Sequence, residues 1–395
     1  MRIGVDATCW TNGRGYGRYA RALLSAVLEL DAHNQYVFFV DHESEEFPLP
    51  AGVEVRRVAT KVPTIRAAGA DSRRSLADLW AVAQAIRKER LDVIYFPAMY
   101  SYVPLFTRTP RIVTIHDTIP ELFPELVFPT LRSRIFYGAK NKLGIWQSRL
   151  LLTVSEYSRR CLVEKLRIPT DRLRVVSEAA EPIFRPLGRT VNGEVAERWG
   201  IPTAARCLIF VGGFSPHKNL FMLLDVFREL ISQEKHADLH LILVGDHERD
   251  SFNSCYGQLQ ERVQVLGLAG RVLFTGHVED KDLVILLNRA EALLLPSFSE
   301  GFGLPGIEAA ACGTPVVATT QSPLPELLGE GVIAVDPADR AGWLGAIERV
   351  LGGALLRSRM GKAALAGASR MSWKNSARQL LAAFDEVQRG YHAAA

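Results

Sequence analysis

The most informative segment of the sequence is SEGFGLPGIEAAACGTPVVA, residues 299–318. An apolar run at 292–295 precedes it and predicts a buried strand, and we expect a helix to begin near Gly306. Glycines let a backbone come close to a ligand, and the N–H groups at a helix N-terminus attract phosphate. Glu300 would open the loop at the end of this strand, and Glu308 would lie in the first turn of the helix. Each carboxylate can accept hydrogen bonds from sugar hydroxyls. One such glutamate alone would be an ordinary helix charge, but the whole segment indicates a binding site.

The rest of the chain consists of two runs in which strands alternate with helices. The first run has expected strands at 2–5, 36–40, 53–58, 92–96, 111–115, 150–154 and 174–176, and helices at 19–30, at 75–88 and from Ser155 or Ser158 to Lys165. The second run has strands at 207–211, 240–244, 272–274, 292–295 and 314–318, with helices between them that include 220–231. This alternation predicts parallel sheets covered on both faces.

We therefore expect an α/β protein with two Rossmann-like, doubly wound domains that face each other across a cleft. The first domain would span residues 1–185 and the second residues 200–372, joined by a connection that contains several prolines and glycines. Residues 373–395 would form a C-terminal helix that could cross back to the first domain.

The segment at 299–318 resembles the E-x7-E motif of the retaining family-4 glycosyltransferases, which have the GT-B fold. Both glutamates have the spacing of that motif, with Gly-Phe-Gly-Leu-Pro between them and Gly-Thr-Pro-Val-Val after them. In that family the first glutamate lies beside the donor sugar and the second binds the ribose hydroxyls. The resemblance implies these roles for Glu300 and Glu308. It also implies donor-binding positions at Val278, Phe302, Gly303 and Leu304.

A second similarity to that family is FVGGFSPHKNL, residues 210–220, an expected strand followed by a glycine turn and a helix start. The resemblance implies that Lys218 contacts the donor diphosphate as a point charge, with Gly213 at the phosphate-binding turn. Many members of the family carry an arginine where this chain has Gly213. One cation of the usual pair is therefore absent there, and His217 or a residue of the other domain would have to compensate.

The first half of the chain adds two similarities. Residues 12–19, NGRGYGRY, link the first strand to the first helix and resemble the N-terminal glycine loop of the family, which implies that the amide of Gly15 contacts the donor phosphate. His116 and Asp117 follow the expected strand at 111–115, at the sheet edge where ligands bind. The resemblance implies that His116 contacts the transferred sugar, and a purely structural role for this histidine is the alternative.

Together these residues imply a metal-independent glycosyltransferase that moves a hexosyl group, with retention, from a nucleotide-sugar to an acceptor hydroxyl. His116, Lys218 and Glu300 would be the catalytic residues. The mannosyl group of GDP-mannose is the starting hypothesis for the donor. A glycan or lipid-linked molecule is the expected acceptor, in the synthesis of surface polysaccharide, lipid-linked glycan or glycoconjugate. A nucleotide-sugar epimerase or hydrolase of the same fold, and a non-catalytic nucleotide-binding subunit, are the alternatives.

The tripeptide Asp280-Lys281-Asp282 has the form D-x-D, the metal motif of a different glycosyltransferase fold. It lies at an expected helix start, where acidic residues are common caps, and we interpret it as such a cap. No metal and no cofactor are expected, because lysines and helix dipoles can carry the charge of the diphosphate.

The composition is that of a soluble globular protein, with 48% hydrophobic and 23% charged residues. No apolar run reaches the roughly 18 residues that a membrane-spanning helix needs. The five cysteines are scattered without paired spacing, which argues against a zinc site or a disulfide framework and suits a reducing cytosol. We therefore expect a cytoplasmic protein.

The charge is unevenly distributed, because residues 1–200 carry a net +7 and the remainder −3, which together give the overall +4. In the basic half, cations are interleaved with aromatic residues: Arg132, Arg134, Lys140, Lys142 and Arg149 with Phe136, Tyr137 and Trp146. One interpretation is peripheral contact with the inner face of a membrane or with a lipid-linked acceptor. The other is a solvated helix whose aromatic side chains are buried. No compact basic stripe dominates, so nucleic acid is not an expected partner.

Overall fold

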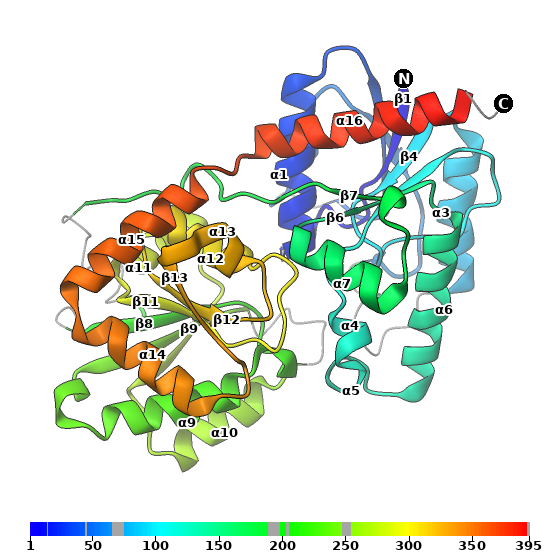
Figure 1. Ribbon diagram of the computed structural model, residues 1–395. Helices are drawn as coiled ribbons and strands as arrows, with labels where there is room; N and C mark the ends of the chain where they lie inside the picture. Colours follow the sequence, from blue (N-terminus) through cyan, green and yellow to red (C-terminus); the bar gives the residue numbers. More distant parts are fainter. Residues whose placement is uncertain are drawn as a thin grey trace. The chain divides into compact units, whose positions relative to one another are not determined.

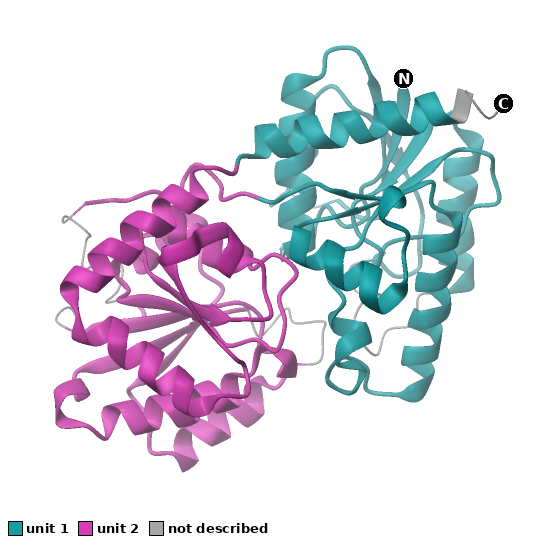
Figure 2. Ribbon diagram, in the orientation of Figure 1, with its two compact units in different colours: residues 1–178, 372–395 teal, residues 179–371 magenta. Residues whose placement is uncertain are grey.

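The structure is a computed structural model (Figure 1) that describes residues 1–13, 15–43, 46–64, 75–188, 198–202, 205–246 and 254–392. Two compact units make up the chain (Figure 2). Unit 1 contains residues 1–178 and 372–395, and unit 2 contains residues 179–371. The start of unit 2 is held by Asn288, whose side chain donates to the Arg185 carbonyl at 3.0 Å and accepts from the Leu187 amide at 2.8 Å.

Unit 1 is a seven-stranded parallel sheet in the order β3-β2-β1-β4-β5-β6-β7, with helices around it. The strands are β1 Arg2–Asp6, β2 Gln35–Val40, β3 Glu54–Arg57, β4 Val93–Phe96, β5 Arg111–Thr114, β6 Leu150–Thr153 and β7 Leu173–Val175. The helices are α1 Gly15–Leu30, α3 Leu76–Lys88, α4 Ile119–Leu122, α5 Pro124–Val127, α6 Leu131–Gln147, α7 Glu156–Leu166 and α16 Trp373–His392, with a 3-10 turn at Thr170–Arg172. The inner strands are buried along their whole length, because helices cover both faces of the sheet.

The last helix, α16, belongs to unit 1 because it lies against α1 and is tied to β7 by an ion pair (Figure 1). The guanidinium of Arg174 contacts the carboxylate of Glu386 at 2.7 Å. The ring of Phe384, fully buried, meets that of Tyr95 with centroids 5.8 Å apart. These contacts explain how residues more than 190 positions apart in the sequence share one unit.

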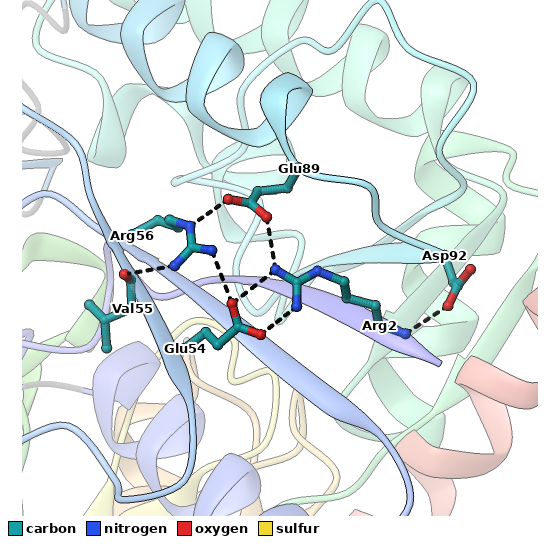
Figure 3. Close-up of polar contacts among 6 residues, drawn as sticks. All are labelled: Arg2, Glu54, Val55, Arg56, Glu89 and Asp92. Atoms are coloured by element: carbon teal, nitrogen blue, oxygen red, sulfur yellow. Dashed lines mark hydrogen bonds and ion pairs between the residues drawn. The ribbon is translucent and has the colours of Figure 1, made fainter.

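Figure 3 shows an ion-pair network at the amino end of the sheet of unit 1. Arg2, at the start of β1, contacts Glu89 at 2.9 Å and also contacts Glu54, at the start of β3. Arg56 contacts the same two carboxylates, and hydrogen bonds from both arginines lower the pKa of Glu89. The network joins β1, β3 and the end of α3. It lies at the end of the sheet opposite to the carboxyl ends where ligands bind in such folds.

Unit 2 is a six-stranded parallel sheet in the order β10-β9-β8-β11-β12-β13. Its strands are β8 Arg206–Val211, β9 Leu239–Val244, β10 Val272–Gly276, β11 Ala292–Leu295, β12 Val316–Thr319 and β13 Val332–Val335. The helices are α9 Leu220–Ile231, α10 Tyr256–Val265, α11 Asp280–Arg289, α12 Leu304–Ala311, α13 Leu324–Leu328, α14 Arg340–Gly352 and α15 Ala354–Ala368, with 3-10 turns at Pro216–Lys218, Glu234–His236 and Gly329–Gly331.

The structure confirms the predicted pair of doubly wound α/β sheets. The edge strand β13 was not predicted, because only one of its four residues is buried and its pattern is weak. In each unit the strand order reverses once, between β1 and β4 in unit 1 and between β8 and β11 in unit 2. Ligands of open parallel sheets bind at the carboxyl side of such a reversal. Within the described ranges, no helix combines the length and apolarity that crossing a bilayer requires.

Candidate functional site

Two of the predicted residues of unit 2 meet at the reversal of its sheet. Lys218 ends the 3-10 turn that follows β8, and Glu300 lies in the loop that follows β11. The Nζ of Lys218 is 2.7 Å from Oε1 of Glu300, and the Oγ of Ser297 donates to the same oxygen at 2.5 Å. The sequence predicted both residues as part of one site, but it did not predict that they form an ion pair.

This pair keeps Glu300 ionised. Burial alone would raise the pKa of Glu300, but the charge and hydrogen bond of Lys218, together with the hydrogen bond from Ser297, outweigh it and lower the pKa. An ammonium group has three donors, and the contact with Glu300 uses one of them. The remaining two can serve an anionic ligand.

Further hydrogen bonds fix the backbone around the pair by joining the turn after β8 to the loop after β11 and to Pro337. Asn219 has φ of +58°, and its side-chain amide donates to the carbonyls of Pro296 at 3.2 Å and Pro337 at 2.9 Å. The amide of Phe298 donates to the carbonyl of His217 at 2.9 Å. Lys218 therefore lies between two residues whose positions are tied to the loop that carries Glu300.

The turn after β8 contains Gly213, with Gly212 before it. A Cβ at the neighbouring Gly245, which directly follows β9, would lie 2.2 Å from the carbonyl oxygen of Gly212. Only glycine fits there, so this part of the turn is packed against the next strand without room for side chains.

His217 lies in the 3-10 turn after β8, beside Lys218. Burial, together with the positive charge of Lys218, lowers the pKa of His217 to about 3. The imidazole is therefore neutral at physiological pH.

The loop after Glu300 leads into α12, whose start differs from the prediction. Gly303 has φ of +79°, and α12 begins at Leu304, because Pro305 is well tolerated in the first turn of a helix. The predicted start at Gly306 was too late. Glu308 consequently lies in the second turn rather than the first, and its side chain is buried.

Two other predicted donor-binding residues, Phe302 and Val278, are buried in unit 2. Phe302 lies in the loop between Glu300 and α12, and Val278 lies between β10 and α11. The predicted residues of unit 2 thus occupy the loops after β8, β10 and β11, at the carboxyl ends of its strands, and the first two turns of α12.

The acidic residues of the D-x-D tripeptide lie in the first turn of α11, one position beyond the predicted cap. The N-cap is Glu279, and its side chain makes no capping hydrogen bond. Asp282 contacts Arg198 at 3.2 Å. In the part of the chain that the structure describes, no group of three or more His, Cys, Asp or Glu side chains is placed to hold a metal ion.

In unit 1, His116 follows β5 and reaches toward the end of β4. Its Nε2 lies 2.9 Å from the carbonyl oxygen of Pro97, which can only accept, so Nε2 carries the proton. Its Nδ1 lies 3.5 Å from Oε1 of Glu178. The rings of Tyr16 and Tyr19 pack edge-on against the imidazole at centroid distances of 4.8 and 4.6 Å.

The contact with Glu178 was missed by the sequence analysis. Glu178 is buried just after β7, two positions beyond the expected strand at 174–176. The sequence did offer one signal for this contact: Glu178 is a carboxylate just after an expected strand, at the end of the sheet where ligands bind.

Gly15 and Gly17 begin α1 and differ in their surroundings. A Cβ at Gly15 would have nothing within 4 Å, whereas a Cβ at Gly17 would lie 1.9 Å from the carbonyl oxygen of Asn12. The same oxygen accepts from Nη1 of Arg21 at 2.8 Å, which holds the loop against the helix. Gly15 therefore leaves open space at the N-terminus of a helix, where backbone N–H groups favour anions.

Comparisons with known proteins agree with these features. Residues 13–181 match the family described as Glycosyltransferase Family 4, and residues 192–366 match the family described as Glycosyl transferases group 1. The O-antigen chain mannosyltransferase B of Escherichia coli is 30% identical over 278 residues, which is 69% of this chain and 69% of that protein.

Two solved structures share the fold over nearly the whole chain. Sucrose-phosphate synthase from Thermosynechococcus elongatus has a TM-score of 0.75 at 18% identity and covers 100% of both chains. HepE from Anabaena, in complex with UDP-glucose, has a TM-score of 0.71 at 17% identity and covers 97% of this chain and 99% of its own. With the matched families and the E-x7-E residues in place at the reversal of the second sheet, the chain belongs to the family-4 glycosyltransferases and has the GT-B fold.

Proposed function

We propose that this glycosyltransferase transfers a hexosyl group from a nucleotide-sugar to an acceptor hydroxyl with retention of the anomeric configuration, without a metal ion. The observation that carries the proposal is the Lys218–Glu300 pair at the reversal of the second sheet. It places a cation suited to a diphosphate directly beside a carboxylate suited to a sugar ring.

Each predicted residue is assigned to one part of the donor. In unit 2, Lys218 contacts the diphosphate, Glu300 the transferred hexose and Glu308 the ribose diol. In unit 1, the amide of Gly15 contacts the donor phosphate, and His116, whose Nε2 is held by the Pro97 carbonyl, contacts the hexose. These assignments to ligand groups come from the family resemblance, and the charges and hydrogen bonds described above are compatible with them.

The proposed reaction proceeds on one face of the sugar. The acceptor oxygen forms the new bond to the anomeric carbon as the bond from that carbon to the phosphate oxygen breaks. The acceptor proton passes to the departing phosphate. Lys218 stabilises the charge that develops on this phosphate, and Glu300 can stabilise positive charge on the sugar. The protein contributes alignment and electrostatics rather than a covalent intermediate.

For the donor we propose GDP-mannose, which the likeness to the mannosyltransferase of Escherichia coli supports. A uridine nucleotide is the alternative, because HepE, which shares the fold, was solved with UDP-glucose. For the acceptor we propose a glycan or lipid-linked molecule of surface polysaccharide or glycoconjugate synthesis. We also propose that the enzyme acts in the cytoplasm.

The test is a thermal-shift screen with GDP-mannose, UDP-glucose, ADP-glucose and dTDP-glucose, since a bound ligand raises the melting temperature by mass action. The best donor is then incubated with candidate acceptors, and the anomeric configuration of the product is determined by NMR. An α-linked product from an α-linked donor supports retention, and a β-linked product contradicts it. Free hexose or an epimerised donor formed without acceptor would indicate a hydrolase or epimerase, and binding without any product a non-catalytic subunit.

Replacing Glu308 by alanine is expected to weaken donor binding. The substitution removes a charged acceptor for the ribose diol, which costs about 2 kcal/mol, or roughly thirtyfold in Kd. Isothermal titration calorimetry with the nucleoside diphosphate measures this directly, and Glu326→Ala on α13 serves as a control in the same unit. An unchanged affinity of Glu308→Ala would contradict the ribose assignment.

Lys218→Ala is expected to reduce kcat about tenfold, because one charge-assisted contact to the leaving diphosphate is lost. Lys218→Arg should retain more activity, since the charge remains although the donor geometry changes. Steady-state kinetics of both variants decide the matter. Wild-type rates for both would mean that other groups neutralise the diphosphate.

Activity is expected to survive EDTA. The acidic pair of α11 lies in a helix first turn, where negative charge is stabilised by the helix dipole, and Asp282 is occupied by Arg198. Turnover is measured before and after dialysis against EDTA. Loss of activity that Mg²⁺ or Mn²⁺ restores would overturn the metal-independent mechanism.

A further inference from the structure

In unit 1, six large apolar side chains that are more than 60% exposed lie on three neighbouring segments of the chain. They lie on α3, on the loop at 97–110 between β4 and β5, and on α6, and each is between 61% and 83% exposed: Leu76, Trp80, Phe106, Leu131, Ile135 and Trp146. We call these six residues the apolar face. Single exposed apolar residues are ordinary on a protein surface, but a group of six that includes two tryptophans indicates an interaction site.

On α6 three of the exposed apolar residues lie on one side of the helix, together with the exposed Lys142. Leu131, Ile135 and Trp146 are separated by four and eleven residues, so they lie on the same side of the helix. The buried residues Asn141 and Gly144 lie on another side. The helix has 17 residues and is therefore about 25 Å long, and this side carries apolar side chains near both ends with Lys142 between them.

The other part of the apolar face is joined to α6 through Gln147, the last residue of this helix. Its Oε1 accepts from the amide of Leu105 at 3.1 Å, which holds the loop beside Trp146. The same loop and α3 line a groove of about 250 Å³, with Trp80 on one wall and Phe106 on the other. α3 and α6 thus both contact this loop.

The charges on these segments have one sign. Exposed cations on or next to them are Arg87, Lys88, Arg108, Arg132, Arg134, Lys142 and Arg149. The carboxylate of Asp78 is the only one in α3, α6 and the loop at 97–110, all of which are described, and it is buried and accepts from the amide of Lys61 at 2.9 Å. On these three segments the exposed charges are therefore all basic, and the cations lie among and beside the apolar residues.

This charge pattern distinguishes between possible occupants. A symmetric contact between two copies of the chain would place the same basic residues against one another, which is unfavourable. An anionic lipid surface complements both properties, because tryptophans settle at the headgroup level and cations are attracted to anionic lipids. The structure also excludes the alternative of a helix whose aromatic residues are all buried, since Trp146 is 75% exposed.

We propose that the apolar face of unit 1 is a docking surface for an anionic phospholipid membrane. α6 lies in the plane of the interface, Trp80, Phe106 and Trp146 enter the headgroup region, and the surrounding cations bind lipid phosphates. The proposal requires no assumption about the donor, the acceptor or the mechanism.

The experiment is flotation of the full chain with vesicles of phosphatidylcholine alone or with an equal part of phosphatidylglycerol. We expect binding to the anionic vesicles that weakens as salt rises, and little binding to the zwitterionic ones. Equal binding to both kinds of vesicle, or to neither, would overturn the proposal. Sedimentation in the absence of lipid tests the other occupant, and a dimer that Trp146→Ser dissociates would assign the face to a second copy.

Two variants and two matched controls locate the surface. The triple variant Arg132→Gln, Arg134→Gln, Lys142→Gln should lower partitioning into anionic vesicles about a hundredfold, at roughly fivefold per cation. The control Arg228→Gln, Lys362→Gln, Lys374→Gln loses the same charge elsewhere and should bind like the wild type.

The apolar variant Ile135→Ser, Trp146→Ser should lower partitioning at least about tenfold, since it removes the area that would enter the interface. Its control, Val265→Ser, Leu355→Ser, removes equally exposed side chains of unit 2. All replaced side chains are exposed, so the melting temperatures should stay near that of the wild type. If each variant binds like its control, this face does not contact the membrane, and the proposed function is unaffected.

Discussion

Replacing Glu300 by glutamine is expected to lower kcat about a hundredfold while the Kd of the nucleoside diphosphate does not rise. Glu300 is assigned to the transferred hexose, and losing one well-placed interaction with developing charge costs about 3 kcal/mol in the transition state. The nucleotide keeps its own contacts. Because Lys218 is paired with Glu300 at 2.7 Å, removal of the carboxylate charge also leaves the ammonium more available to the diphosphate.

The ion pair adds a second measurement to this prediction. Without the carboxylate, the partly buried ammonium of Lys218 lacks a counter-ion, which destabilises the free protein. The diphosphate supplies that counter-ion, so it should raise the melting temperature of Glu300→Gln by more than that of the wild type. If nucleotide affinity is lost together with activity, the carboxylate holds the loop rather than the sugar.

The matched change in unit 1 is His116→Ala. Its turnover should fall with nucleotide affinity unchanged, because His116 is also assigned to the transferred hexose. The ring packs between Tyr16 and Tyr19, so the melting temperature must be measured with the kinetics. A fall in melting temperature that accounts for the lost activity would show that this histidine is structural.

Gly17→Ala is expected to destabilise unit 1 strongly. A Cβ at this position would lie 1.9 Å from the carbonyl oxygen of Asn12, so the loop or the start of α1 must move. Such overpacking costs about 3 kcal/mol, which corresponds to a fall in melting temperature of roughly 6–12 °C in a domain of this size. Differential scanning calorimetry measures the change.

Gly15→Ala, two positions earlier, is the matched control for stability. Its Cβ would meet no atom within 4 Å, and alanine favours a helix over glycine, so the melting temperature should stay level or rise slightly. The same variant tests the phosphate contact, because a methyl group at the site of close approach should raise the KM for the donor. Equal melting temperatures for both variants would show that the loop is not packed as described.

The sequence sufficed for the architecture because the parallel strands are buried apolar runs bounded by turns. Strands such as 92–96 and 292–295 were recognisable without any context. The edge strand β13 was missed because half-exposed residues carry little pattern. The start of α12 was placed too late because Gly306 was taken as the punctuation and Pro305 as part of the loop, although proline favours a first helical turn.

The contacts between side chains are harder to predict from sequence than the strands and helices on which those side chains lie. Lys218 and Glu300 were assigned to the same ligand from 82 residues apart, but their direct contact depends on the order in which β8 and β11 pair. The contact of His116 with Glu178 likewise depends on strands that are not consecutive. To predict that Trp146 is exposed, one must know which side of α6 packs against the sheet. The sequence of α6 alone is compatible with a buried or an exposed Trp146.

The discontinuity of unit 1 has a consequence for biosynthesis. Residues 1–178 leave the ribosome first, but α16 is made only after the whole of unit 2. This helix packs against α1 and β4, and its Leu380 and Phe384 are fully buried. At about 5–20 residues per second, the roughly 190 residues of unit 2 delay this helix by roughly 10–40 s. During that interval the nascent first unit exposes the apolar surface that α16 later covers, whereas unit 2 is contiguous and can fold as it emerges. During synthesis, the unit made first is therefore the one that exposes apolar surface for longest. A chaperone that holds nascent chains would act on this unit.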